Sequence, residues 1–205
     1  EARTLLGRTL GTLRRGTAPA TPIAAAPAAT ARQIVLVDRP ESAQSVIRIG
    51  NVSLRRADPD WVPFTVANQL LGGGVSARLF MDLRELRSLS YGAYARASEN
   101  VGVGSWFAGG QVRNAVTVDA LQALMQHLEC LTTEASPDDE LAQTRRYLID
   151  SFPLSIETPG NVADLVSAMR IYGLPADYYD TLRARVTAVD AATSLANARR
   201  YIHPD

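Results

Sequence analysis

The stretch LLGGGVSARLFMDLRELRSLSYGAYA, residues 70–95, contains the change from helix to strand on which the fold of this chain depends. Three glycines, Gly72–Gly74, end the helix that precedes them. A short amphipathic helix then spans about 76–87 and turns its leucines inward. The sequence Ser88-Leu89-Ser90 breaks this helix, and Tyr91 opens a strand. We therefore expect a helix-to-strand corner between the short helix and the strand.

The regions on both sides of this corner supply the other strands. The apolar, β-branched run IVLVD (34–38) predicts a buried strand, and residues 45–54 predict a second one. A helix starts at Asp58-Pro59-Asp60 and runs to the three glycines. After the corner, residues 91–98 and 102–112 predict two strands joined by a turn.

From Val118 onward the pattern is helical, with clear start and stop signals. Helices are expected over 119–133, after Ser136-Pro137, after Thr158-Pro159, and near 177–187 and 190–202. Strands joined by short turns favour antiparallel pairing, and the helices must cover one face of the sheet. The predicted fold class is therefore α+β, a two-layer sandwich with an antiparallel sheet of about four to six strands and helices on one face.

The chain divides into three parts, and the composition of the first 32 residues marks the first two. Residues 1–15 carry leucines at near-helical spacing and are expected to be the end of a preceding domain. Residues 16–32 are rich in Ala and Pro, which is typical of a linker. Residues 33–205 form the main domain. We expect the chain to be a piece of a longer protein, because it starts at Glu1 and not at Met.

Composition excludes several classes of partner. The formal net charge is zero, so no nucleic-acid partner is expected. No apolar run is long enough to span a membrane. All 21 basic residues are Arg and none is Lys, which, with the many Ala residues, points to a GC-rich bacterial genome. The compartment stays open between periplasm and cytoplasm. The single cysteine, Cys130, lies in a periodic helix and is interpreted as a packing residue.

Two histidines, His127 and His203, are too few and too far apart for a zinc-peptidase helix, which needs two His about one turn apart and a Glu. We predict no metal site and no cofactor in this chain. Gly72–Gly74 cannot be a phosphate loop, because that motif needs a Lys. We interpret these glycines as a helix stop, and the alternative is a loop that lets backbone approach a bound peptide closely.

Arg84 and Tyr91 are the candidate substrate-binding residues, and no catalytic residue is assigned. Arg84 lies near the edge of the short helix and Tyr91 at the start of the next strand, so the two side chains could meet at the corner. A guanidinium and a phenol there would offer donors to a carbonyl oxygen or a carboxylate. From spacing alone, a packing or ion-pair role is the more common one for such a pair.

Residues 33–205 resemble the C-terminal half of the pitrilysin, or insulinase-like, zinc metallopeptidases, a family that includes mitochondrial processing peptidase. The family pattern is close to Leu-Gly-Gly-Gly, Ser-Arg-Leu and Arg-Glu-x-x-Gly-Leu-x-Tyr. Here it reads Leu71-Gly72-Gly73-Gly74, Ala77-Arg78-Leu79 and Arg84-Glu85-Leu86-Arg87-Ser88-Leu89-Ser90-Tyr91. Further similar motifs follow in the family's order: the strand around Ile47-Arg48-Ile49-Gly50, Asp58-Pro59-Asp60, Ser151-Phe152-Pro153 and Tyr172-Gly173-Leu174-Pro175.

The resemblance implies a non-catalytic, substrate-binding half of a bacterial zinc metalloendopeptidase. Arg84 and Tyr91 would reach the peptide across a chamber, opposite a zinc-bearing half that is a partner on the same polypeptide or a separate subunit. Zinc is expected in that half, and this chain is not expected to hydrolyse peptides alone. The alternative is a structural assembly module of the same fold. Ser88 stands where the family has Gly, so a positive φ there would affect the aim of both side chains.

Overall fold

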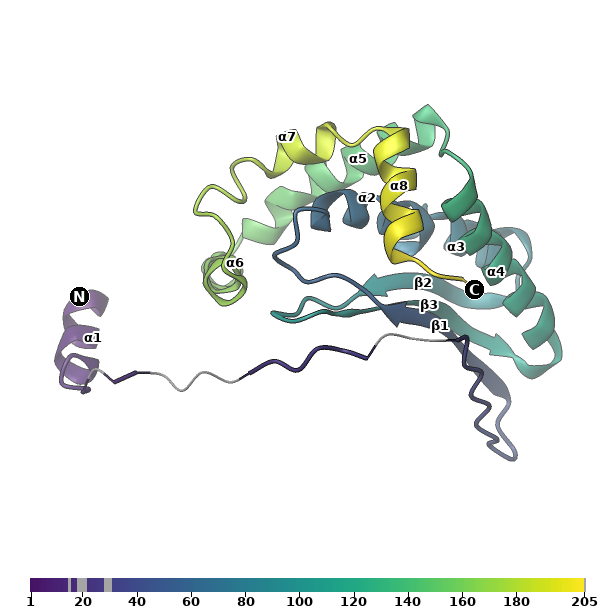
Figure 1. The fold of residues 1–205 in the computed structure, drawn as a ribbon, viewed down its shortest axis with the longest axis horizontal. Coiled ribbons are helices and arrows are strands. Elements are labelled where there is room, and N and C mark those ends of the chain that lie inside the picture. The colour runs from purple at the N-terminus through teal and green to yellow at the C-terminus, as the bar shows by residue number, and fades with distance from the viewer. Residues whose placement is uncertain (15, 18–21, 28–30, 205) are drawn as a thin grey trace.

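The computed structural model describes residues 1–14, 16–17, 22–27 and 31–204 and shows an α+β fold (Figure 1). Its described part contains an antiparallel sheet with the strand order β1-β3-β2. The strands are β1 (Gln44–Val52), β2 (Ser90–Ala97) and β3 (Ser105–Arg113). Helices cover one face of this sheet. The predicted fold class is confirmed, and the sheet has three strands within the described ranges where four to six were expected.

The missing strand is the run 34–38, for which the prediction was wrong. Residues 34–38 form no strand, and Ile34, Val35, Leu36 and Val37 are 73–92% exposed. Among the described residues, β1 pairs with β3 alone, so residues 34–38 have no neighbouring strand. An apolar β-branched run fits a half-buried pleated surface, and it needs a hydrogen-bonded neighbour to become a strand. The local pattern cannot supply that neighbour.

The main hydrophobic core lies between the sheet and three helices. These are α2 (Trp61–Gly72), α4 (Thr117–Thr133) and α8 (Ala191–Tyr201). The core side chains alternate along each strand, as expected for a sheet with one covered face. They include Ile47, Ala93, Ala95, Trp106, Ala108 and Val112 from the sheet, and Phe64, Leu71, Leu124 and Leu128 from the helices. Trp106 also donates its indole N–H to Oδ1 of Asn68, at 2.8 Å.

A second, smaller core lies between α2 and two further helices. These are α5 (Asp138–Ser151) and α7 (Leu182–Thr187). Helix α7 begins five residues later than the predicted start at 177, because residues 176–181 form turns. The buried members of this core are Val62, Val66, Leu70, Leu141, Val186 and Val189. Helix α2 therefore contributes to both cores.

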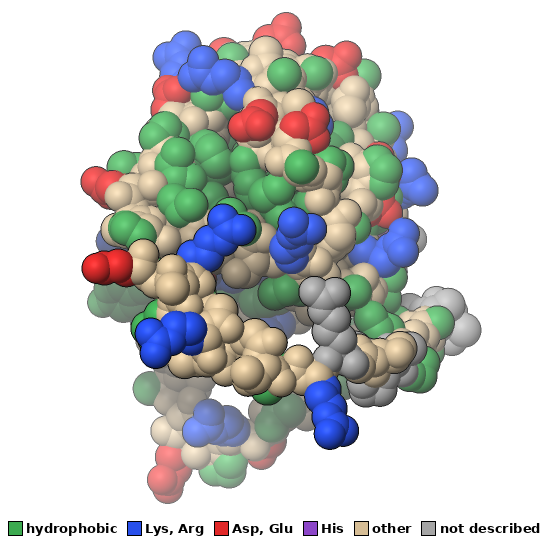
Figure 2. Space-filling view, turned by 90° about the vertical axis from the view of Figure 1, so that its left-hand side faces the viewer, with side chains coloured by type: hydrophobic (Ala, Val, Ile, Leu, Met, Phe, Trp, Pro, Cys, Tyr) green, Lys and Arg blue, Asp and Glu red, His purple; other side chains and the backbone are tan. Residues whose placement is uncertain are grey.

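Helix α6 (Pro159–Tyr172) lies outside both cores. Thr158 caps its start by accepting a hydrogen bond from the backbone N–H of Asn161 (3.2 Å), and Gly173 ends it with φ +66°. None of its residues is buried. Together with the 3₁₀ turn Phe152–Ile156, it exposes Leu154, Ile156, Val162, Val166 and Ile171. Figure 2 shows the end of the molecule that carries α6 and α1 (Ala2–Leu10), where hydrophobic side chains gather on the surface.

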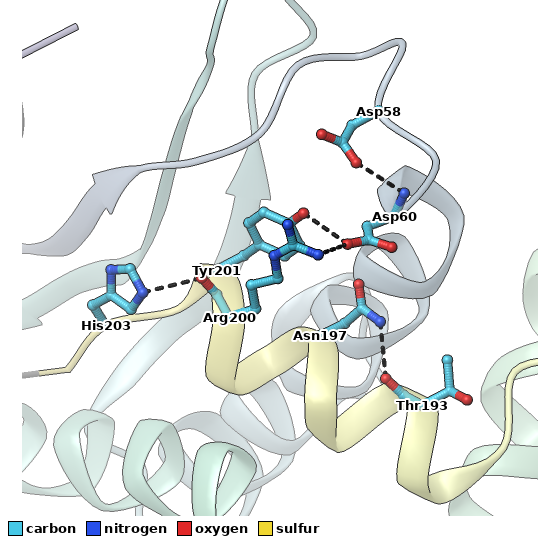
Figure 3. Close-up of polar contacts among 7 residues, drawn as sticks. All are labelled: Asp58, Asp60, Thr193, Asn197, Arg200, Tyr201 and His203. Carbon is cyan, nitrogen blue, oxygen red and sulfur yellow. Dashed lines mark hydrogen bonds and ion pairs between the residues drawn. The ribbon is translucent and has the colours of Figure 1, made fainter.

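The C-terminal helix α8 is tied to the start of α2 through Asp60 (Figure 3). Oδ2 of Asp60 accepts hydrogen bonds from the hydroxyl of Tyr201 (2.8 Å) and from Nη1 of Arg200 (2.7 Å). Burial and the neighbouring carboxylates, above all Asp60, raise the pKa of Tyr201. Asp58 in turn accepts from the backbone N–H of Asp60 (3.0 Å). The contacts of Asp60 with Arg200 and Tyr201 thus join elements about 140 residues apart in the sequence.

No helix in the described ranges is long and apolar enough to cross a membrane.

Candidate functional site

The predicted helix over 76–87 is a composite turn. Helix α3 (Arg78–Phe80) runs directly into the π-helical turn η1 (Met81–Leu86), and β2 follows at Ser90. The widened turn is closed by backbone hydrogen bonds from Arg87 N to Asp82 O (2.9 Å) and from Leu89 N to Leu83 O (2.7 Å). Single π turns are rare and occur often at functional sites. The predicted helix-to-strand corner is therefore present, with a geometry that helical periodicity did not indicate.

Ser88 occupies the left-handed backbone region at this corner, with φ +51°. A residue with a Cβ atom is strained there, and glycine is not. Ser88 stands where the pattern that this stretch resembles has glycine, and the backbone at this position does have a positive φ. Serine adopts that conformation, so the corner forms at the cost of local strain.

Replacing Ser88 with Gly is expected to raise the free energy of unfolding by about 1 kcal/mol, because the strain of a left-handed residue with a Cβ is removed. The measurement is urea denaturation followed by circular dichroism. Ser88→Ala is the matched control, since alanine keeps the Cβ and should give no gain. Equal stability of the two variants would show that Ser88 is not strained.

Arg84 lies on η1 and is 46% exposed. Its guanidinium carbon is 4.8 Å from the ring centroid of Phe80, a cation–π geometry. Its Nε is 3.4 Å from Oε1 of Glu85, at the surface. These contacts hold the side chain loosely and leave the guanidinium accessible to a ligand.

Tyr91 lies in an irregular part of β2 and is 87% exposed. The pairing of β2 with β3 shifts between Ser90 and Ala93, so Tyr91 is part of a β-bulge. Oγ of Ser90 accepts from the backbone N–H of Gly92 (3.1 Å) and lies 2.6 Å from the carbonyl oxygen of Gln111. A bulge changes the direction of a side chain. Here the local hydrogen bonds of Ser90 stabilise the bulge and direct Tyr91 to the surface.

The structure places Arg84 and Tyr91 on adjacent elements that are joined by residues 87–89. Within the described ranges, the contacts of the Arg84 guanidinium are with Phe80 and Glu85, and no hydrogen bond joins it to the phenol of Tyr91. Both side chains present their polar groups to solvent. The two side chains project from the same corner, and the geometry shows no direct contact between their polar groups.

Two other arginines are held more firmly, one of them buried and the other partly buried. Arg56 is 6% exposed, donates to the hydroxyl of Tyr178 (2.7 Å) and stacks on that ring at 4.7 Å. Arg78 makes a two-pronged ion pair with Glu140 (2.6 and 2.7 Å), and this pairing raises the pKa of Arg78. Arginines that are paired in this way join elements of the fold. Arg84 differs from both in its exposure and in the looseness of its contacts.

A polar bridge that the sequence did not reveal fastens η1 to α4. The carboxylate of Asp82 lies 2.9 Å from Nε2 of His127 and 2.9 Å from Nε of Arg87. Partial burial alone would raise the pKa of Asp82, but the hydrogen bonds from His127 and Arg87 outweigh it and lower that pKa. The sequence indicated only that His127 is not part of a zinc motif. Its partner is 45 residues away in the sequence, so no local signal could have identified the bridge.

The described residues hold no group of three or more His, Cys, Asp or Glu side chains that could bind a metal ion. His127 contacts Asp82, and the ring of His203 contacts the carbonyl oxygen of Arg200 at 3.1 Å.

The glycines 72–74 end a helix, as predicted. Helix α2 stops at Gly72, and Gly73 follows in its C-cap position. Gly72 also lies against β2: a Cβ built on it would be 2.4 Å from the backbone nitrogen of Ala95. The absence of a side chain at Gly72 therefore lets α2 pack closely on β2 within this chain, and the contact does not involve a bound peptide.

A hollow of about 620 Å³ lies at one end of the sheet. It is lined by residues 23–27, the end of β1, the β2–β3 loop at 101–103, and His203. Neither Arg84 nor Tyr91 lines it. The candidate binding residues are thus on open surface.

Comparisons with known proteins agree with this fold. The sequence model of the family described as peptidase M16 inactive domain matches residues 1–148. An uncharacterized zinc protease of Streptomyces coelicolor is 27% identical over 169 residues, which are 82% of this chain. The chain spans only 37% of the length of that relative.

Solved structures show the same architecture. The peptidase M16 inactive domain from Pseudomonas fluorescens superposes with a TM-score of 0.75 at 24% identity, over 80% of this chain and 39% of that one. The periplasmic protease PqqL from Escherichia coli superposes with a TM-score of 0.74 at 14% identity, over 98% of this chain and 22% of that one.

Proposed function

Because this chain belongs to the family of peptidase M16 inactive domains, we propose that it is the substrate-binding, non-catalytic half of a zinc metalloendopeptidase. A second half would carry the zinc ion and the attacking water. This half would bind the peptide through Arg84 and Tyr91. The zinc-bearing half is the expected partner, on the same polypeptide or as a separate subunit.

The observation that carries this proposal is the exposure of both side chains at one structured corner. Arg84 and Tyr91 extend from a π turn and a β-bulge, two irregular features that a strictly structural pair would not need. Both groups are hydrogen-bond donors suited to a peptide carbonyl oxygen and to the negative charge that develops on it during attack. Zinc in the other half would polarise the carbonyl and activate the water.

Exposed apolar surface supports the need for a second half. Every leucine of α1 is more than half exposed, and none of its residues is buried. We propose that residues 1–15 end the zinc-bearing half, that 16–32 link the halves, and that 33–205 are the substrate-binding domain. A helix whose apolar stripe has no core to cover is typical of one that packs on another domain.

The purified chain is expected to contain far less than one equivalent of zinc and to leave a fluorogenic peptide uncleaved. Addition of the zinc-bearing half, expressed from the same gene or its neighbour, should produce hydrolysis that a chelator abolishes. The measurements are metal analysis by mass spectrometry and a continuous fluorescence assay. One tightly bound zinc per isolated chain would contradict the proposal. An assembled pair that holds zinc and leaves every peptide of a mixed library uncleaved would favour the structural assembly module.

A further inference from the structure

We propose that Asp82 is a positioning residue for Arg84: its carboxylate, held by His127 and Arg87, fixes the π turn that presents the guanidinium to the peptide. This inference rests on the proposed function, because it assigns Asp82 a role through Arg84. Asp82 itself does not touch substrate.

The bridge connects the turn to a rigid element. His127 projects from α4, whose neighbouring residues Leu124 and Leu128 are completely buried in the main core. Asp82 is 14% exposed and contacts His127 and Arg87 at 2.9 Å each. Charge-assisted hydrogen bonds of this length are stronger than neutral ones, and partial exclusion of water strengthens them further. The position of Asp82 is thus determined by α4 and by the end of its own turn.

Two consecutive anchors determine how the turn is rotated. Leu83 is completely buried in the core, and Asp82, one residue earlier, is fastened to α4. Anchors at adjacent positions point in different directions around a helix axis, so together they prevent rotation of the turn. Arg84 is the next residue and extends to the surface. Its direction therefore depends on both anchors.

The π geometry makes the second anchor necessary. A π turn is rare, since the α-helical arrangement is favoured locally. Leu83 alone can stay buried while the turn tightens, but the bridge requires Asp82 to remain opposite His127. Loss of the bridge would let the turn relax and would move Arg84 away from the peptide. Phe80, on which the guanidinium stacks, would move with it.

The test is a double-mutant cycle in the assembled peptidase, with kcat and KM measured for Asp82→Asn, Arg84→Ala and the double variant. Asp82→Asn should lower kcat/KM about tenfold, since a displacement of about 1 Å in a binding group can reduce rates strongly. In the Arg84→Ala background the same change should have no further effect, because its action goes through Arg84. Asp82→Glu, which keeps the carboxylate, should recover part of the loss.

His127→Leu is a second variant that breaks the bridge without touching η1, because leucine has no hydrogen-bond donor, and it should reproduce the loss of Asp82→Asn. Asp180→Asn removes an exposed carboxylate on a distant turn and serves as the charge control. Circular dichroism and thermal unfolding verify that each variant is folded at the assay temperature.

The outcomes separate the two proposals. Unchanged rates in both Arg84→Ala and Tyr91→Phe would refute the proposed function. A low rate in Arg84→Ala with wild-type rates in Asp82→Asn and His127→Leu would refute only the positioning role. Equal losses from Asp82→Asn in both backgrounds would also overturn it, since they would show that Asp82 acts on stability or on another group.

Discussion

Replacing Arg84 with Ala in the assembled peptidase is expected to lower kcat/KM by about one to two orders of magnitude, and Tyr91→Phe by about one, judged from single oxyanion donors. Arg84 offers a charged donor that can hold a carbonyl oxygen more strongly as negative charge develops on it. Tyr91→Phe removes a single hydroxyl and leaves the exposed ring in place. The measurement is steady-state hydrolysis of a peptide substrate.

The matched control for Arg84 is Arg170→Ala. Arg170 is also exposed and lies in the last turn of α6, so its removal changes the charge equally. This control should keep the wild-type rate. Thermal unfolding should show little change for Arg84→Ala, because a surface ion pair such as that with Glu85 contributes little to stability. Wild-type turnover in both Arg84→Ala and Tyr91→Phe would mean that the pair is only structural.

Replacing Gly72 with Ala is expected to lower the free energy of unfolding by about 3 kcal/mol, the upper end of the usual cost of overpacking. The new Cβ would lie 2.4 Å from the backbone nitrogen of Ala95 and 2.8 Å from the carbonyl carbon of Tyr94. Both atoms belong to the backbone of β2, which cannot rotate away as a side chain can. Either α2 or β2 would have to shift, and α2 contributes to both cores. Urea denaturation of the chain measures the loss.

Gly74→Ala is the matched control for Gly72→Ala. The nearest atom to a Cβ at Gly74 is Nε2 of Gln69, at 3.2 Å, and this is the end of a flexible side chain. We expect a change of less than about 1 kcal/mol there, since the side chain can move at little cost. If the two variants were equally stable, the packing of Gly72 against β2 would not be the constraint that the distances indicate.

The helix boundaries of this chain could be predicted because their signals are local. Thr158-Pro159 starts α6 and Gly173 ends it, as expected from the capping and left-handed preferences of these residues. The glycines after Leu71 also end α2, although Gly73 at its C-cap keeps a right-handed backbone with φ −79°. The α+β class follows from the order of such segments. Each of these signals lies within a few residues of the feature that it determines.

The candidate site could be predicted only in part. Arg84 and Tyr91 were found through a resemblance of sequence motifs, and the corner between them was expected from the break at Ser88-Leu89-Ser90. The π turn under Arg84 and the bulge at Tyr91 were not expected, because both depend on hydrogen bonds that a periodic pattern does not encode. The direction of the two side chains follows from these irregularities.

The sequence by itself determined where most helices begin and end, that no zinc motif is present, and which residues form the helix-to-strand corner. Only the tertiary structure decided that residues 34–38 form no strand, that Asp82 meets His127, and that Gly72 packs on β2. The physical reason is the distance along the chain over which each interaction acts. Caps and glycine stops involve neighbouring residues, whereas strand pairing and a partly buried polar bridge need partners that only folding brings together.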